Sequence, residues 1–135
     1  MMVRTPATVQ LQFPARPEFL RAARMLMAAL ASQLDFDYDA IEDLKLAIGE
    51  ACTNAIRHGS ILGETMVTVT WTIDDAALTV EVRDEGRAGD GEDDEENEDL
   101  ERGGLGLLVM RAVMDEVALE ALPEGGHAIR LVKRR

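Results

Sequence analysis

The chain has 135 residues, with 47% hydrophobic and 30% charged side chains and a formal net charge of −12. This length and composition fit one globular domain, and we expect a single domain over residues 1–135. One cysteine excludes an internal disulfide, no apolar run reaches the roughly 20 residues of a membrane span, and the N-terminus lacks the apolar core of a signal peptide. We therefore expect a cytoplasmic protein that does not bind a membrane.

The acidity of the chain is local. Nine of the 26 acidic residues fall within residues 90–101, so the rest of the chain is only mildly acidic. No basic patch with interleaved aromatic residues is present, and nucleic acid is therefore not an expected partner. The few arginines near the N-terminus suit an acidic protein surface instead.

The first half of the chain predicts a strand and two helices. Residues 7–13 alternate apolar and polar side chains, as in a half-buried strand. Apolar residues at spacings of three and four predict a helix over 18–34. A second helix, over 39–58, follows a cluster of aspartates that can cap its N-terminus. Gly59 is the stop signal expected at its C-terminus.

The second half predicts strands around one helix. Residues 66–73 and 78–82 alternate apolar and polar positions on either side of an Asp-Asp turn, which is typical of an antiparallel hairpin. Residues 84–104 combine glycines with the acidic run and predict a mobile loop. A helix and a closing hairpin are then predicted over 105–115, 117–122 and 127–132.

Helices mixed with hairpin-connected strands, without a βαβ series, predict an α+β fold. The expected architecture is a two-layer α/β sandwich. Its helices would lie on one face of a mixed, mostly antiparallel sheet.

One polar row runs along the otherwise apolar second helix. Glu50, Asn54 and His58 are each four residues apart, so they share a helix face. A carboxylate on such a face is costly to desolvate without a partner or a task. Two interpretations stay open at this point: a polar rim or cap, and a metal-and-base pair, since carboxylate and amide oxygens suit Mg²⁺. His58 itself is expected to be a helix-end residue without a further role.

Two further signals are weak when taken singly. Asp84 and Gly86 follow a strand, as in many turns, but an aspartate there can also accept a hydrogen bond from a ligand amino group. Gly104 and Gly106 open a helix, either as a hinge or as a site where backbone N–H groups bind phosphate. No P-loop pattern is present.

The three signals in this order are more specific than any one of them. They resemble the Bergerat ATP-binding fold of gyrase-type ATPases and histidine kinases, the GHKL superfamily, from about residue 7 to 133. Within it the chain is most similar to the small bacterial anti-sigma-factor serine/threonine kinases. The stretches that carry this resemblance are Glu50-Ala-Cys-Thr-Asn-Ala-Ile-Arg-His-Gly59 and Glu98-Asp-Leu-Glu-Arg-Gly-Gly-Leu-Gly-Leu107.

The resemblance implies roles around the adenine base and the metal. Asn54 would bind the Mg²⁺ that bridges the ATP phosphates. Asp84 would accept a hydrogen bond from the adenine amino group, and Gly86 would let the base approach the backbone. Glu50 would be the catalytic base that orients and deprotonates the attacking hydroxyl.

The resemblance also implies how the phosphates are held. Backbone amides of Gly104, Leu105 and Gly106 would contact them. Arg102 would contact the transferring phosphate. Residues 87–103 would form a lid that closes over ATP.

The function implied is an ATP-binding anti-sigma factor with protein-serine/threonine kinase activity. It would sequester a sigma factor, contacted by Arg24, and phosphorylate a STAS-domain anti-anti-sigma antagonist. The family also implies a homodimer. The alternative is a catalytically weak ATP-binding scaffold that holds partners without efficient phosphate transfer.

Two features depart from the family pattern. His127 stands where the family usually has a threonine near the adenine aspartate, so adenine anchoring is expected to differ. The acidic lid is richer in carboxylates than usual, and like charges at such range cost on the order of 1 kcal/mol per pair even in water. We expect this lid to be disordered without Mg-ATP and its acids to point outward when it closes.

Overall fold

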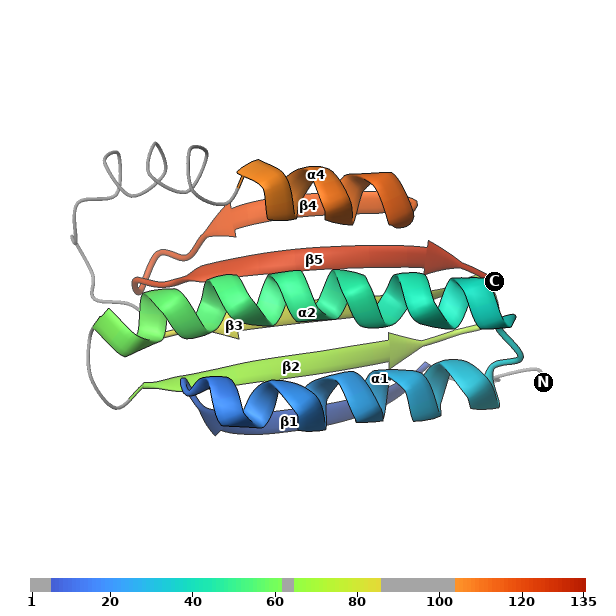
Figure 1. Cartoon of the computed structure of the whole chain (residues 1–135), viewed down its shortest axis with the longest axis horizontal. Helices are drawn as coiled ribbons and strands as arrows, with labels where there is room; N and C mark the ends of the chain where they lie inside the picture. The colour runs from blue at the N-terminus through green and yellow to red at the C-terminus, as the bar shows by residue number, and fades with distance from the viewer. Residues whose placement is uncertain (1–5, 62–64, 86–103) are drawn as a thin grey trace.

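The structure, a computed structural model, describes residues 6–61, 65–85 and 104–135. Strands and helices follow one another closely along these residues (Figure 1). In chain order they are β1 (Ala7–Pro14), the short 3-10 helix η1 (Pro17–Phe19), α1 (Leu20–Gln33), α2 (Tyr38–Ile61), β2 (Met66–Ile73), β3 (Ala77–Asp84), α4 (Gly104–Val113), β4 (Glu116–Ala121) and β5 (His127–Arg134).

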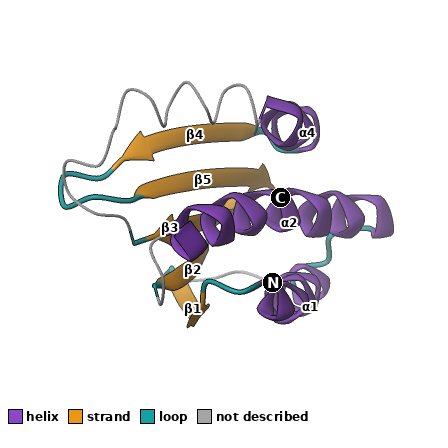
Figure 2. Ribbon diagram, turned by 60° about the vertical axis from the view of Figure 1, so that its left-hand side comes forward, coloured by secondary structure: helices purple, strands orange, loops and turns teal. Residues whose placement is uncertain are grey.

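The five strands form one sheet in the order β1-β2-β3-β5-β4, and each described pair is antiparallel. Helices α1, α2 and α4 lie together on one face of this sheet, as Figure 2 shows from the side. The two-layer α/β sandwich is therefore confirmed. Where the sequence predicted a mixed, mostly antiparallel sheet, the described pairing is antiparallel throughout.

The core lies between the helices and the inward face of the sheet. Val67, Val69 and Trp71 of β2 alternate with threonines and are fully buried. The indole N–H of Trp71 donates a hydrogen bond to the sulfur of Met27 on α1 at 3.4 Å, which ties the helix layer to the sheet. Because successive side chains of a strand point to opposite faces of the sheet, the alternation of apolar residues in the sequence predicts which side chains of β2 face the core.

Short polar side chains set the local boundaries. Asp37 Oδ1 accepts a hydrogen bond from the Ala40 N–H at 2.8 Å and caps α2, as the aspartate cluster predicted. At the β2–β3 turn, Asp74 Oδ1 accepts hydrogen bonds from the N–H groups of Ala76 and Ala77 at 2.8 and 2.9 Å. These two hydrogen bonds therefore fix the position of the β2–β3 turn.

The helix stop predicted at Gly59 is wrong, because α2 continues through this residue to Ile61. A β carbon placed on Gly59 would lie 2.5 Å from Ala15 Cβ and 2.5 Å from Thr65 Oγ1. These two neighbours are joined by a hydrogen bond from the Ala15 N–H to the Thr65 carbonyl at 2.9 Å. Glycine is therefore required here for close packing of the helix and not for a turn.

Most of the predicted loop, and the predicted lid over 87–103, fall on residues 86–103, which lie outside the described residues. Among the described helices, none is both long enough and apolar enough to cross a membrane.

Candidate functional site

A cavity of about 200 Å³ opens between α2, α4 and strands β3, β4 and β5. Its walls are mostly apolar, and its polar lining consists of Asn54, His58, Asp84, Glu120 and His127. An apolar pocket with a few convergent polar groups is the usual form of a small-molecule site. The fold thus brings Asn54 and Asp84, which were singled out separately in the sequence, to one cavity.

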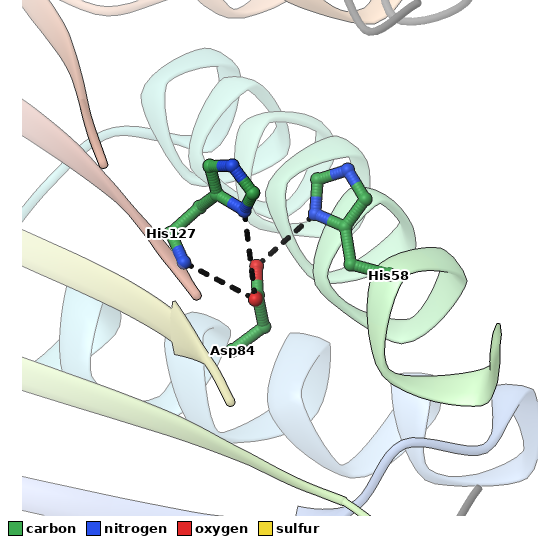
Figure 3. Close-up of polar contacts among 3 residues, drawn as sticks. All are labelled: His58, Asp84 and His127. Carbon is green, nitrogen blue, oxygen red and sulfur yellow. Dashed lines mark hydrogen bonds and ion pairs between the residues drawn. The ribbon is translucent and has the colours of Figure 1, made fainter. Parts of the chain in front are cut away.

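Asp84 lies at the C-terminal end of β3 with only 6% of its surface exposed. His58 Nδ1 is 3.1 Å from Asp84 Oδ2. The backbone N–H of His127 donates to Asp84 Oδ1 at 3.2 Å, and the ring Nδ1 of His127 is 3.7 Å from the same oxygen. Figure 3 shows both imidazole rings beside the carboxylate. We call these three residues the His-Asp-His cluster.

The charge of Asp84 follows from opposed effects. Burial raises the pKa of this carboxyl, whereas the hydrogen bonds from His127 and His58, with the favourable charge interactions of the two imidazoles, lower it. The net result holds the pKa of Asp84 below its ordinary value of 3.8. An ionised carboxylate only accepts hydrogen bonds, so His58 Nδ1 carries the proton in this contact.

His58 is the site residue that the sequence reasoning missed. The sequence predicts only a helix end there, whereas the structure places it against Asp84, 26 residues further along the chain. The available signal was its spacing of four from Asn54, which puts both side chains on one face of α2. Helical periodicity identifies such a face but not its partner on a distant strand.

Glu50 is half-buried about two helical turns from His58, against the first turn of α4. A β carbon on Gly106 would lie 3.2 Å from Glu50 Oε2 and 3.6 Å from Glu50 Cδ. Gly104 and Leu105 begin the same turn, and the Leu105 side chain is exposed. Because the first four N–H groups of a helix have no intrahelical partner, this turn can bind an anion beside Glu50.

Arg24 lies on α1, next to the backbone of α2. A β carbon on Gly49 would be 3.8 Å from Arg24 Cδ, so the side chain of this exposed arginine lies against Gly49, the residue before Glu50. Gly86 and Arg102 fall outside the described residues, and their roles stay predictions.

Asn54 occupies the middle of the polar row on α2. Residues four apart on a helix are separated by about 6 Å along its axis, so Asn54 lies one such step from His58 and one from Glu50. Amide and carboxylate oxygens are the ligands that Mg²⁺ prefers, and Mg²⁺ needs only one or two of them from the protein. The middle of the row, at Asn54, therefore fits Mg²⁺, whereas the imidazole nitrogen at the His58 end suits other metals.

Comparison with known sequences identifies relatives over nearly the whole chain. A family model described as histidine kinase-like ATPase domain matches residues 13–133. A serine-protein kinase RsbW from Bacillus licheniformis is 34% identical, covering 98% of this chain and 88% of its own. A serine-protein kinase RsbW from Listeria monocytogenes is 38% identical, covering 82% of this chain and 78% of its own.

Solved structures share the fold. The RsbU and RsbW domains of a Mycobacterium tuberculosis protein match with a TM-score of 0.71 and 20% identity, over 95% of this chain and 32% of the other. The SiaB-SiaC complex from Pseudomonas aeruginosa contains a chain that matches with a TM-score of 0.71 and 14% identity, over 92% of this chain and 88% of the other. At these identities the likeness shows the fold alone.

Proposed function

Because the chain belongs to the histidine kinase-like ATPase family, we propose that it is an ATP-dependent protein-serine kinase that acts as an anti-sigma factor. Relatives that match nearly the whole chain are named serine-protein kinases. The observation that carries the proposal is the polar row of α2. At one end of the row, His58 contacts Asp84 of β3. Asn54 follows in the cavity wall, and Glu50 lies at the other end, beside the N-terminus of α4.

The row supplies the length that an extended nucleotide needs. The adenine amino group would donate a hydrogen bond to Asp84 inside the cavity. From there the row follows α2, and Glu50 lies about 12 Å from His58 along the helix axis. ATP laid along the row would bring its phosphates to the first turn of α4.

Phosphate transfer would depend on groups of this chain at that turn. Backbone N–H groups of Gly104, Leu105 and Gly106 would bind phosphate oxygens. Asn54 would hold Mg²⁺, which neutralises phosphate charge when bound. Glu50 would accept the proton of the substrate serine hydroxyl while the serine oxygen bonds to the terminal phosphorus of ATP. The bond between that phosphorus and the ADP oxygen breaks, and ADP leaves with its electrons.

We further propose that a sigma factor and a STAS-domain antagonist compete for the surface beside Glu50. Arg24 is exposed and adjoins Gly49, so a protein that contacts Arg24 would cover the approach to Glu50. One surface would then serve both for sequestration and for phosphorylation. The identity of these partners rests on the resemblance to anti-sigma-factor kinases, and the homodimer stays a prediction.

The test measures transfer of radiolabelled phosphate from ATP to candidate STAS-domain proteins, with ATP binding measured separately. Glu50→Gln is expected to bind ATP like the wild type and to lose transfer by roughly 100-fold or more. Asn54→Ala is expected to lose Mg²⁺-dependent binding as well as transfer. Glu42→Gln is the matched control on the same helix, because it removes a carboxylate that pairs with Lys45 at 3.0 Å, two turns from the site.

The outcomes separate the kinase from its alternative. If the wild type binds no nucleotide, the proposal is overturned. Nucleotide binding without transfer to any STAS-domain protein would favour an ATP-binding scaffold. That second candidate is supported by one observation, namely that His58 and His127 already donate hydrogen bonds to the Asp84 oxygens that adenine would use.

The sigma-binding surface needs its own test. Arg24→Glu is expected to weaken capture of the sigma factor without changing ATP binding. Arg130→Glu, which reverses the charge of an exposed arginine on β5, is the control and is expected to bind like the wild type. Equal loss in the two variants would contradict a contact at Arg24.

A further inference from the structure

We propose that the His-Asp-His cluster binds a divalent transition metal of the zinc type, at a position distinct from the Mg²⁺ position at Asn54. The three residues come from three different elements, α2, β3 and β5. Each offers one ligand atom, and the three atoms lie within 4.8 Å of one another. The chain thus carries two metal positions of different chemistry along one cavity.

The spacing of the ligand atoms is near that of a tetrahedral site. Ligands that bind zinc at about 2.0–2.1 Å stand roughly 3.3–3.4 Å apart when the geometry is tetrahedral. His58 Nδ1 and Asp84 Oδ2 are 3.1 Å apart, and His127 Nδ1 and Asp84 Oδ1 are 3.7 Å apart. The two distances end on different oxygens of the Asp84 carboxylate, and one ligand atom from each residue lies within 4.8 Å of the others. Rotation of the two rings toward a single Asp84 oxygen would bring the three ligand atoms around one ion.

The ligand types select the metal. Two imidazole nitrogens and one carboxylate form a set that zinc and its first-row neighbours use, whereas Mg²⁺ prefers oxygen ligands throughout. Binding requires that each imidazole present an unprotonated Nδ1, so the His58 ring would carry its proton on Nε2 in the metal-bound form. The negative charge of Asp84 would offset part of the charge of the ion.

The surroundings leave the ion accessible. The side chains of His58 and His127 are 17% and 20% exposed, and that of Asp84 is 4% exposed. All three line the cavity, so an ion can enter through it and keep a position open for water. Glu120 also lines the cavity but does not belong to the cluster.

A bound ion would also affect the nucleotide. It would take up the Asp84 oxygen that the adenine amino group would use, so metal and nucleotide would exclude one another. This consequence rests on the proposed function, whereas the metal site itself does not. The chain would then release its nucleotide when zinc is abundant.

The experiment titrates the whole chain with Zn²⁺ against a chromogenic chelator and with Co²⁺ by visible absorption. His127→Thr removes one ring but keeps the backbone N–H that donates to Asp84. His58→Gln removes the other ring but keeps a side-chain donor. Each variant is expected to lower Zn²⁺ affinity at least about tenfold and to abolish the visible Co²⁺ bands. Glu120→Gln is the matched control and is expected to bind both ions like the wild type.

Thermal unfolding with a chelator present checks that each variant is folded without metal. In a separate measurement without chelator, added Zn²⁺ is expected to raise the Tm of the wild type and of Glu120→Gln, and to leave the Tm of the two histidine variants unchanged. Wild-type affinity no higher than that of the histidine variants would overturn the site. So would an equal loss of affinity in Glu120→Gln, because the ligands would then differ from those assigned.

Adenosine separates the two proposals, because it has no phosphates that bind metal. Loss of the Co²⁺ bands on addition of adenosine would support mutual exclusion. Persistence of the bands in a chain that binds ATP with Mg²⁺ when zinc and cobalt are absent would overturn exclusion. Failure of the chain to bind ATP with Mg²⁺ in the absence of zinc and cobalt would overturn the proposed function and leave the metal site standing.

Discussion

The carboxylate of Glu50 packs on the backbone of Gly106, where a β carbon would stand 3.2 Å from Glu50 Oε2. This separation is tighter than most contacts of real β carbons, so any side chain at position 106 has to displace the carboxylate by a few tenths of an ångström. The contact between α2 and α4 therefore determines where Glu50 points. A group that moves a proton depends on its position at this scale.

Gly106→Ala is expected to lower the rate of phosphate transfer by about tenfold to 100-fold, because it shifts the carboxylate of Glu50. The measurement is the steady-state rate of transfer to the protein substrate. The control is the same substitution in a Glu50→Ala chain, where it should have almost no further effect. A full additional loss in that background would mean that Gly106 acts independently of Glu50.

Gly59→Ala is expected to lower the free energy of unfolding by about 1–3 kcal/mol, because the new methyl group would overlap Ala15 and Thr65. Gly49→Ala on the same helix is the matched control. Its β carbon would meet Arg24 Cδ at an ordinary 3.8 Å, so the gain in helix propensity should stabilise the chain by up to about 1 kcal/mol. Urea denaturation measures both, and changes of the same sign would contradict the packing role of Gly59.

Asp84 is expected to make the chain less stable in acid. Burial, which raises the pKa of Asp84, is outweighed by the hydrogen bonds of His127 and His58, so the folded-state pKa lies below the ordinary 3.8. Between the folded-state pKa and 3.8, Asp84 is mostly protonated in the unfolded chain and mostly ionised in the folded chain. The stabilisation is therefore complete above about pH 5 and is lost as the pH falls through the folded-state pKa.

The free energy of unfolding of the wild type should accordingly decline more steeply between about pH 5 and pH 3 than that of Asp84→Asn. Urea denaturation across this range, with a chelator present, provides the comparison. Both histidines remain in the variant, so the two chains differ only in the carboxyl group of Asp84. Parallel curves for the two chains would show that Asp84 does not contribute.

The thiol of Cys52 is expected to be unreactive in the folded chain. Burial raises its pKa to about 12, and the side chain is fully enclosed in the core. Iodoacetamide at about pH 8 should therefore label it only through unfolding, since the reactive species is the thiolate. The labelling rate should rise with urea in parallel with the unfolded fraction. Rapid labelling without urea would mean that α2 opens locally.

The fold could be predicted in detail because its signals are local. The alternation of β2 and the aspartate cap of α2 each depend on residues close together in the chain, and the structure confirms both. The helix stop predicted at Gly59 is wrong because a glycine that ends a helix and a glycine against which another segment packs look identical in sequence. The positions of Ala15 and Thr65 in the fold distinguish the two cases.

The candidate site could be predicted only in part for the same reason. Asn54 and Asp84 were found because the order of their motifs resembles a known family, and the fold does bring them to one cavity. The partner of His58 could not be found, since the contact with Asp84 spans 26 residues and two elements. His127 departs from the family pattern in the sequence, but its backbone hydrogen bond to Asp84 depends on the pairing of β3 with β5.

The place of β5 in the sheet has a consequence for how the chain matures on the ribosome. Among the described strands, β4 pairs only with β5, which is synthesised after it and pairs with β3 on its other side. A nascent chain that stops short of β5 therefore lacks the strand with which β4 pairs, and it lacks His127. The part of the cavity wall formed by β4 and β5 therefore assembles only after β5 has left the exit tunnel, so we expect a ligand held by this wall to assist folding only once β5 has been synthesised.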